Sequence, residues 1–153
     1  MDKSALMELA QALLLTIGAL TGKPMPETLP EIRILPAAVM QERACRDPCR
    51  IKAFYIPHEG VYLSDALNIK NDVHAKSILL HELMHFVQNA RGSFDPGGID
   101  CDRWYDQEME AYEVQNAFLR RYGEQRLMWV DRLPKDLCRN RVEQESGDAK
   151  APK

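Results

Sequence analysis

The sequence predicts an α+β fold, in which a small sheet of about three strands packs on a central helix and on a second helix that follows it. Three observations carry this prediction. Apolar residues recur at helical spacing in three long segments, short β-branched and aromatic runs lie between the first two segments, and the middle segment is apolar over most of its circumference. A helix of that last kind is buried at the centre of a domain.

Length and charge limit the class of protein. The chain has 153 residues and a net charge of -3. We expect a single domain over residues 1–142, followed by a disordered polar tail over residues 143–153. Basic residues form no stripe, so no nucleic-acid partner is expected. No apolar run approaches the length of a membrane span, so no membrane partner is expected. The sequence does not indicate the oligomeric state.

The first helix is expected over residues 4–20, and Gly22 is a typical residue just beyond a helix end. Its leucines resemble the core of a signal peptide. However, Glu8 and Gln11 interrupt the apolar run, and no small-residue cleavage site follows it. The pattern therefore favours an amphipathic helix.

Strands are expected in the next part of the chain. After a proline-rich connector, residues 32–35 alternate and predict a short strand, whereas residues 37–50 are ambiguous and compatible with a short helix. Residues 51–56 and residues 61–63 predict two more strands, and the turn-forming residues between them predict a hairpin.

Two further helices complete the predicted fold. Asp72 is a suitable N-cap for the central helix, which we expect to end at Gly92. A flexible loop follows. Asp102 is a suitable N-cap for a long helix over residues 103–122, and Trp129 indicates further helical packing beyond it.

The four cysteines are Cys45, Cys49, Cys101 and Cys138. They allow two disulfides in three pairings, a structural zinc site, or reduced and buried thiols, and their spacing does not choose among these. The lack of a clear signal peptide favours a cytoplasmic location. Disulfide bonding would instead favour a secreted or periplasmic one.

The most informative motif is the H-E-x-x-H run from His81 to His85. Residues four apart share one face of a helix, so both imidazoles can bind a single metal ion. Glu82 projects beside that face, where it can accept a proton from a metal-bound water. The motif therefore predicts a Zn2+ site of the kind found in zinc hydrolases. His74, which is seven residues before His81, is more simply a surface or capping residue.

A catalytic zinc site needs a third protein ligand. The positions at which metzincins carry glycine and histidine are Gln88 and Arg91, which excludes that class. A glutamate from the following helix is the other common solution. We expect Glu108 to be the ligand, because it lies on one stripe with the small residue Ala111, which permits close helix contact. Glu110 is the second choice.

These motifs resemble those of the gluzincin metallopeptidases. In that family the third ligand is a glutamate in an E-x-x-small pattern on a helix after the H-E-x-x-H helix. The similar residues here are His81 to His85, followed by Glu108-x-x-Ala111. The chain is similar to the minimal gluzincins and to small uncharacterised bacterial zincin-like proteins. The resemblance spans roughly residues 50–120. Many gluzincins carry an acidic residue four positions after the ligand glutamate, where this chain has Tyr112.

The resemblance implies a zincin-like fold and metal-assisted hydrolysis of a peptide or protein substrate. Zinc would polarise a water and the scissile carbonyl, while Glu82 transfers the proton to the leaving amine. Candidates for hydrogen-bond donation to the oxyanion are Tyr112, His58 and Tyr62, in that order. The hairpin of residues 51–63 would pair with extended substrate.

Two other functions are compatible with the same residues. One is a zinc-stabilised binding or regulatory protein without turnover, and the other is hydrolysis of a non-peptide amide. The presence of Glu82 favours catalysis, because a purely structural zinc site needs no general base.

Overall fold

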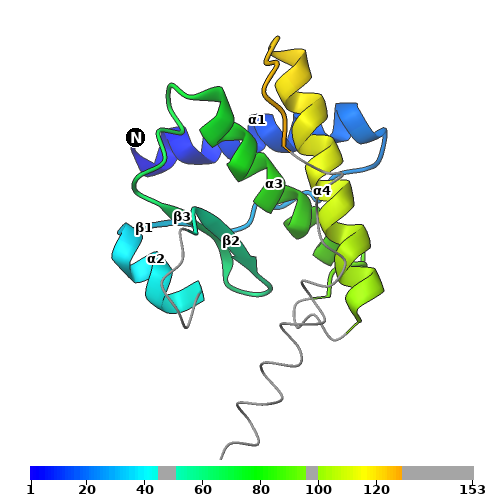
Figure 1. Ribbon diagram of the computed structural model, residues 1–153, viewed down its shortest axis with the longest axis horizontal. Coiled ribbons are helices and arrows are strands. Elements are labelled where there is room, and N and C mark those ends of the chain that lie inside the picture. Colours follow the sequence, from blue (N-terminus) through cyan, green and yellow to red (C-terminus); the bar gives the residue numbers. More distant parts are fainter. Residues whose placement is uncertain (45–50, 96–99, 129–153) are drawn as a thin grey trace, which may run out of the picture.

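The computed structural model describes residues 1–44, 51–95 and 100–128, in which four helices and a three-stranded sheet form an α+β fold (Figure 1). The predicted fold class is confirmed at this level. The helices are α1 (Lys3–Thr21), α2 (Ala37–Ala44), α3 (Val73–Ala90) and α4 (Cys101–Arg121). The strands are β1 (Ile32–Leu35), β2 (Ala53–Ile56) and β3 (Gly60–Ser64).

The sheet is mixed and has the strand order β1-β3-β2. β2 and β3 form the expected antiparallel hairpin, and β1 runs parallel to β3. Every residue of β3 is buried, because α3 packs on one face of the sheet and α2 on the other (Figure 1). Val61 and Leu63 therefore join the main core, while the ring of Tyr62 lies 4.7 Å from the guanidinium of Arg43 on α2.

Gly60 permits the close approach of β1 and β3. Its φ is 113°, and a Cβ at this position would lie only 2.1 Å from the carbonyl oxygen of Glu31. That carbonyl accepts a hydrogen bond of 2.8 Å from the backbone N–H of Val61, which is the first rung of the parallel pair. A larger residue would push the two strands apart.

α1 packs against α3 and α4 and completes the core (Figure 1). Contrary to the expectation above, this helix is long and apolar enough to cross a membrane. Core helices of soluble proteins and signal sequences share that property. Here one side of α1 is buried in the core, through Leu6, Ala10, Leu13, Leu14 and Ile17.

The ends of α3 and α4 show where the expected caps are correct. Asp72 caps α3 as predicted, with its carboxylate accepting a hydrogen bond from the N–H of His74. The prediction that Asp102 caps α4 is wrong. The cap is Asp100, whose carboxylate accepts from the N–H of Arg103, so that the helix begins two residues earlier. Both aspartates are suitable capping residues, and only the path of the preceding loop decides between them.

Cys101, the first residue of α4, is disulfide-bonded. The other three cysteines, the expected packing of Trp129 and the expected tail from residue 143 lie outside the described residues. The same holds for residues 96–99 of the expected flexible loop.

Candidate metal centre

α3 presents a polar stripe to α4 along an otherwise apolar helix. Ser77, His81, His85 and Gln88 follow one another at spacings of four, four and three residues, and all four are buried. This spacing places them on one face of the helix. The two histidines are only 7% and 5% exposed, and their ring centroids lie 4.8 Å apart. The helix therefore places two imidazoles side by side in the interior.

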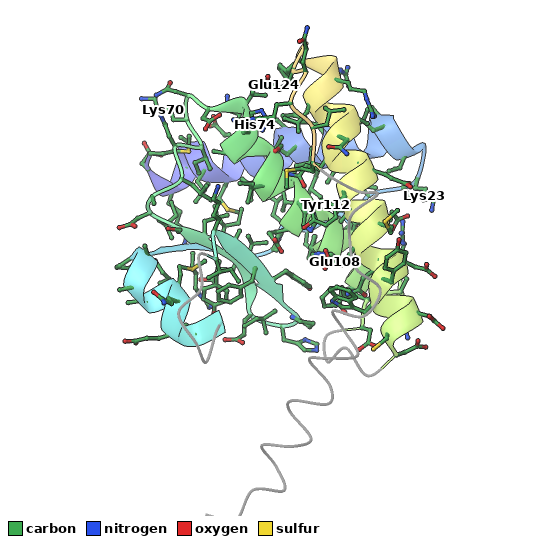
Figure 2. The ribbon with its side chains drawn as sticks, in the orientation of Figure 1. Lys23, Lys70, His74, Glu108, Tyr112 and Glu124 are labelled. Atoms are coloured by element: carbon green, nitrogen blue, oxygen red, sulfur yellow. The ribbon has the colours of Figure 1, made fainter. Side chains whose placement is uncertain are left out.

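α4 carries Glu108 (Figure 2), and its carboxylate lies close to the two imidazoles. The Nε2 atom of His81 lies 3.1 Å from Oε2, and the Nε2 atom of His85 lies 3.0 Å from Oε1. Ala111, one turn further along α4, is completely buried in the core and lets the two helices approach closely. The structure thus brings together the three residues that the sequence predicts as metal ligands.

The geometry of these three side chains fits a zinc ion. Zinc in proteins binds imidazole nitrogen and carboxylate oxygen at about 2.0–2.2 Å, and tetrahedral ligands at that distance lie about 3.3 Å from one another. The nitrogen–oxygen distances of 3.0 and 3.1 Å are close to that value, and the ligand atoms all lie within 4.8 Å of one another. Among the described residues, no other group of histidines, cysteines and carboxylates is arranged in this way.

Electrostatic coupling within the cluster is strong. Burial alone would raise the pKa of Glu108, but hydrogen bonds from the two imidazoles outweigh burial and lower it. Burial alone would lower the pKa of His85, but its hydrogen bond and charge attraction to Glu108 raise it to about 9. The carboxylate therefore stays ionised and attracts positive charge, whether that charge is a proton or a metal ion.

Each imidazole is held from behind by a glutamine. The Nδ1 atom of His81 lies 3.0 Å from Oε1 of Gln115, and the Nδ1 atom of His85 lies 2.8 Å from Oε1 of Gln88. From the sequence, Gln88 is equally compatible with a partner behind a ligand histidine and with an exposed helix end, and Gln115 lies on the stripe of Glu108 without an assigned role. The signal for Gln115 was its position seven residues, or two helical turns, after Glu108. The group that His81 contacts at Nδ1 is therefore a neutral amide.

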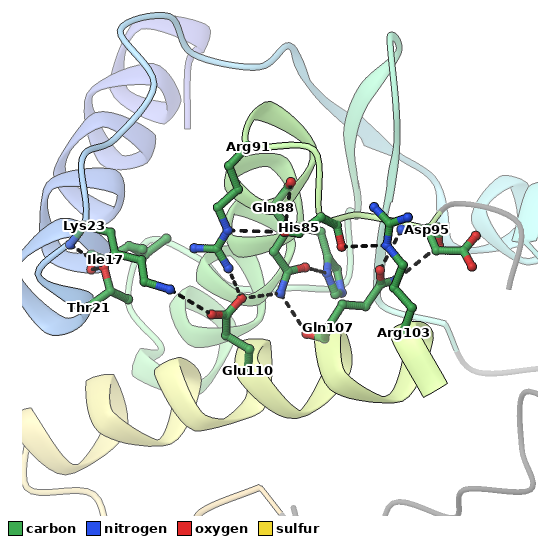
Figure 3. Close-up of polar contacts among 11 residues, drawn as sticks. Ile17, Thr21, Lys23, His85, Gln88, Arg91, Asp95, Arg103, Gln107 and Glu110 are labelled. Atoms are coloured by element: carbon green, nitrogen blue, oxygen red, sulfur yellow. Dashed lines mark hydrogen bonds and ion pairs between the residues drawn. The ribbon is translucent and has the colours of Figure 1, made fainter. Parts of the chain in front are cut away.

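Glu110, the alternative third ligand, points elsewhere (Figure 3). Its Oε1 accepts a hydrogen bond of 2.8 Å from Gln88 and forms an ion pair with Arg91. Its Oε2 lies 3.7 Å from Nζ of Lys23. The alternative is therefore wrong, because Glu108 and not Glu110 is the carboxylate that faces the imidazoles. Glu113, the third carboxylate of this segment, is exposed.

Glu82 lies next to the cluster in a cavity of ≈ 590 Å³. The carboxylate is only 8% exposed, and burial raises its pKa. The imidazoles of His81 and His85 oppose this rise, and the charge of Glu108 adds to it. A buried carboxylate with a raised pKa is suited both to accept a proton and to release it.

Tyr112 lines the same cavity, and its ring centroid lies 4.5 Å from that of His81. Burial is the main reason why its pKa is raised, with smaller contributions from Glu108 and Glu82. Figure 2 shows the side chains of Tyr112 and Glu108 between α4 and α3. The structure therefore places the predicted oxyanion donor beside the predicted ligands.

The two lesser candidates for oxyanion donation are elsewhere. Tyr62 lies on the opposite face of the sheet, where its hydroxyl accepts a hydrogen bond from Arg33 and donates one to Glu59. His58 is exposed in the turn between β2 and β3, with a positive φ of 69°. Both predictions are wrong, because alternation along β3 and the position of the turn direct these side chains away from α3.

His74 is half-buried at the start of α3 and is not part of the cluster, as expected. Its Nε2 atom lies 3.2 Å from Oε2 of Glu124, which is near enough for an ion pair but out of line for a hydrogen bond. His74 also lines the cavity, and Figure 2 shows it near Glu124 at the start of α3.

Among the described residues, no strand pairs with the outer edge of β2, and this edge borders the cavity. β2 is an edge strand, and Ile51, Lys52 and Ala53 line the cavity together with His81. The carbonyl of Lys52 accepts from the N–H of Ser64, so alternation directs the backbone groups of Ala53 away from β3 and toward the open edge. An extended chain can therefore add to this edge beside the cluster.

Comparison with known proteins gives a family and no named relative. No curated protein and no solved structure shows a significant match to the chain. One family model, described as a domain of unknown function (DUF6647), matches residues 2–142. This match includes all the described helices and strands and every residue of the cluster. The chain therefore belongs to the DUF6647 domain family.

Proposed function

We propose that this protein is a zinc-dependent hydrolase, and specifically a small metallopeptidase of the gluzincin type with a zincin-like fold. The observation that carries the proposal is the convergence of His81, His85 and Glu108 at distances of 3.0 and 3.1 Å. The buried carboxylate of Glu82 beside them supports catalysis over a purely structural site. A buried ionisable group without a role is costly to the folded state.

The protein side chains divide the work of hydrolysis. His81, His85 and Glu108 would hold the metal, which would supply Lewis-acid activation of a water and of the scissile carbonyl. Glu82 would accept the proton of the attacking water, and its raised pKa would allow it to pass that proton to the leaving amine. Tyr112 is protonated at neutral pH, as tyrosines ordinarily are, its raised pKa extends that state to higher pH, and it would donate to the oxyanion.

The substrate lies along the edge of β2. The backbone groups of Ala53 face the open edge, and a peptide that pairs with them passes over the cavity that His81 and Glu82 line. The cavity continues past Ile78 and Leu127, so its walls suit an apolar side chain of the substrate.

The cellular compartment follows from the cysteine chemistry. Disulfides are rare in the cytosol and common in secreted and periplasmic proteins. The disulfide of Cys101 therefore favours a secreted or periplasmic location over the cytoplasmic one. It also requires that the protein be prepared without thiol reductants.

The alternative is a zinc-stabilised binding or regulatory protein without turnover. One observation favours it: the two imidazoles and the carboxylate already satisfy one another as ion pairs. The two functions differ in the role of Glu82, which is the general base in the first and has no catalytic role in the second. Among the described residues, its carboxylate takes no part in the ion pairs of His81, His85 and Glu108.

Two measurements test the proposal. Metal analysis of the purified protein is expected to give about one zinc per chain, as for a single three-ligand site. Digestion of a peptide library is then compared for the wild type, Glu82→Gln and Glu113→Gln. The last variant makes the same chemical change at an exposed position of α4.

Cleavage is expected for the wild type and Glu113→Gln and not for Glu82→Gln, although all three bind zinc. Cleavage by Glu82→Gln at the wild-type rate would contradict the mechanism. Full zinc occupancy without cleavage by any of the three would favour the binding function. Absence of zinc from the wild type would refute the metal centre itself.

A further inference from the structure

Two buried glutamines lie behind the imidazoles, and neither takes part in the proposed hydrolysis directly. Gln88 and Gln115 are 0% and 1% exposed. Each directs its side-chain oxygen at a histidine Nδ1 and its side-chain nitrogen at a further group. The groups around each amide determine which way it faces, and this decides where the imidazole protons lie.

The surroundings of Gln115 favour one orientation. Its Nε2 atom lies 3.0 Å from Oγ of Ser77, whose own hydroxyl proton is donated over 2.7 Å to the carbonyl of His74. While that bond is made, Oγ accepts from Gln115, so the amide nitrogen faces Ser77 and the amide oxygen faces His81; a flipped amide would cost the bond to His74. An acceptor oxygen 3.0 Å from Nδ1 of His81 requires a proton on that nitrogen.

The surroundings of Gln88 are more restrictive still (Figure 3). Its Nε2 atom lies 2.9 Å from the backbone carbonyl of Gln107 and 2.8 Å from the carboxylate of Glu110. Both are acceptors only, so they require the two protons of the amide group. The amide oxygen is thereby directed at Nδ1 of His85, which must carry a proton.

We infer that Gln115 and Gln88 are positioning residues that keep a proton on Nδ1 of His81 and His85 and so direct both Nε2 atoms to the metal. This inference rests on the proposed zinc site. The new elements are that neutral amides orient the ligand histidines, and that glutamate can replace one of the two glutamines but not the other. Partners of this kind fix both the tautomer and the angle of a ligand imidazole.

The predicted difference concerns replacement by glutamate. In Gln115→Glu the new carboxylate still accepts from His81, and the hydroxyl of Ser77 can turn to donate to its other oxygen. In Gln88→Glu the new carboxylate faces the carboxylate of Glu110 and a backbone carbonyl, which have no proton to donate. Glutamate is therefore expected to rescue the first position and not the second.

The test compares zinc affinity, by competition with a chelator, for the wild type and four variants: Gln115→Leu, Gln115→Glu, Gln88→Leu and Gln88→Glu. Asn116→Leu is the matched control, because Asn116 is a buried amide on α4 that bonds the backbone of Met128 instead of an imidazole. Both leucine variants and Gln88→Glu are expected to bind zinc about 10–100-fold more weakly, as is usual when such partners are removed. Gln115→Glu and Asn116→Leu are expected to stay within about threefold of the wild type on the same grounds.

A second readout does not depend on zinc or on activity. In NMR spectra of the metal-free protein, each Nδ1 proton is expected as a slowly exchanging downfield resonance, because it is buried and hydrogen-bonded. Gln115→Leu should remove the resonance of His81 and Gln88→Leu that of His85, while Asn116→Leu should keep both. Unchanged resonances and unchanged zinc affinity in the leucine variants would overturn the inference, as would equal rescue by glutamate at both positions. A wild type that shows both resonances but binds no zinc would refute the proposed function and leave the positioning role intact.

Discussion

The metal-free and the zinc-loaded protein are expected to respond to pH in opposite directions. In the folded, metal-free protein the pKa of His85 is raised from 6.5 to about 9 by its contact with Glu108, which outweighs the opposing effect of burial. The folded state therefore holds this proton more tightly than the unfolded state does. The resulting stabilisation is fully present below about pH 6.5 and is lost as the pH rises through about 9.

The size of this effect follows from the shift. One pKa unit corresponds to about 1.4 kcal/mol, so a rise from 6.5 to about 9 gives about 3 kcal/mol of folding free energy. His85 is only 5% exposed, so solvent screens the interaction little. A loss of this size is a large fraction of the stability of a domain of this kind.

Zinc reverses the trend, because a proton and the metal compete for the same Nε2 lone pair. Zinc-loaded protein should therefore lose its added stability as the pH falls through the titration of the imidazoles. In the metal-free protein the lowered pKa of Glu108 also gives stability that is lost in acid, but this loss begins only below about pH 4, outside the range in which His85 titrates.

Urea unfolding followed by tryptophan fluorescence measures these free energies at about pH 6 and about pH 10, with chelator or with zinc. Glu108→Gln is the control, because it removes the carboxylate charge that raises the pKa of His85. The alkaline loss in the metal-free wild type should exceed that in Glu108→Gln by about 3 kcal/mol. Equal losses in the two proteins would refute the coupling, and parallel pH curves with and without zinc would refute a metal bound at the imidazoles.

Three further outcomes are expected. Glu108→Ala should weaken zinc binding in a chelator competition far more than Glu110→Ala, whose carboxylate acts only through a glutamine and should cost about tenfold or less; the reverse ranking would reassign the third ligand. Gly60→Ala should destabilise the fold by at least about 2 kcal/mol in urea unfolding, because its Cβ would lie 2.1 Å from a backbone carbonyl oxygen at a positive φ; a stability like that of the wild type would show that the strands can part. Asp100→Ala should cost about 1 kcal/mol of unfolding free energy, and Asp102→Ala clearly less, because only the former caps α4; equal costs would place the helix start elsewhere.

The sequence alone predicts the features of this protein that depend on local spacing. The pairing of His81 with His85 on one face follows from the helical repeat, as does the stripe that joins Glu108 to Ala111. The cap at Asp72 and the hairpin between β2 and β3 follow from short-range chemistry as well. These patterns need no knowledge of what packs against them.

Choices between neighbouring candidates depended on the tertiary structure. Glu108 and Glu110 lie about 200° apart around α4, so only the rotation of that helix against α3 decides which one meets the imidazoles. Tyr62 faces away from the cluster because α2, and not α3, covers its side of the sheet. The sequence ranks Tyr112 above Tyr62 but does not exclude Tyr62, since each pattern is local and the packing partner is not.

The two glutamines show most clearly which features the sequence determines and which the tertiary structure decides. Gln88 and Gln115 are neutral residues that match no metal-site motif. Helical spacing places them on the faces of predicted metal ligands, but exposed residues can share that spacing. Gln115 comes within 3.0 Å of His81 only because α4 packs against α3. Gln88 lies on α3 three residues after His85, but α4 supplies the backbone carbonyl and the carboxylate that orient its amide. Helical periodicity determines which residues can share a face, whereas the burial of that face against a particular neighbour determines which of them act together.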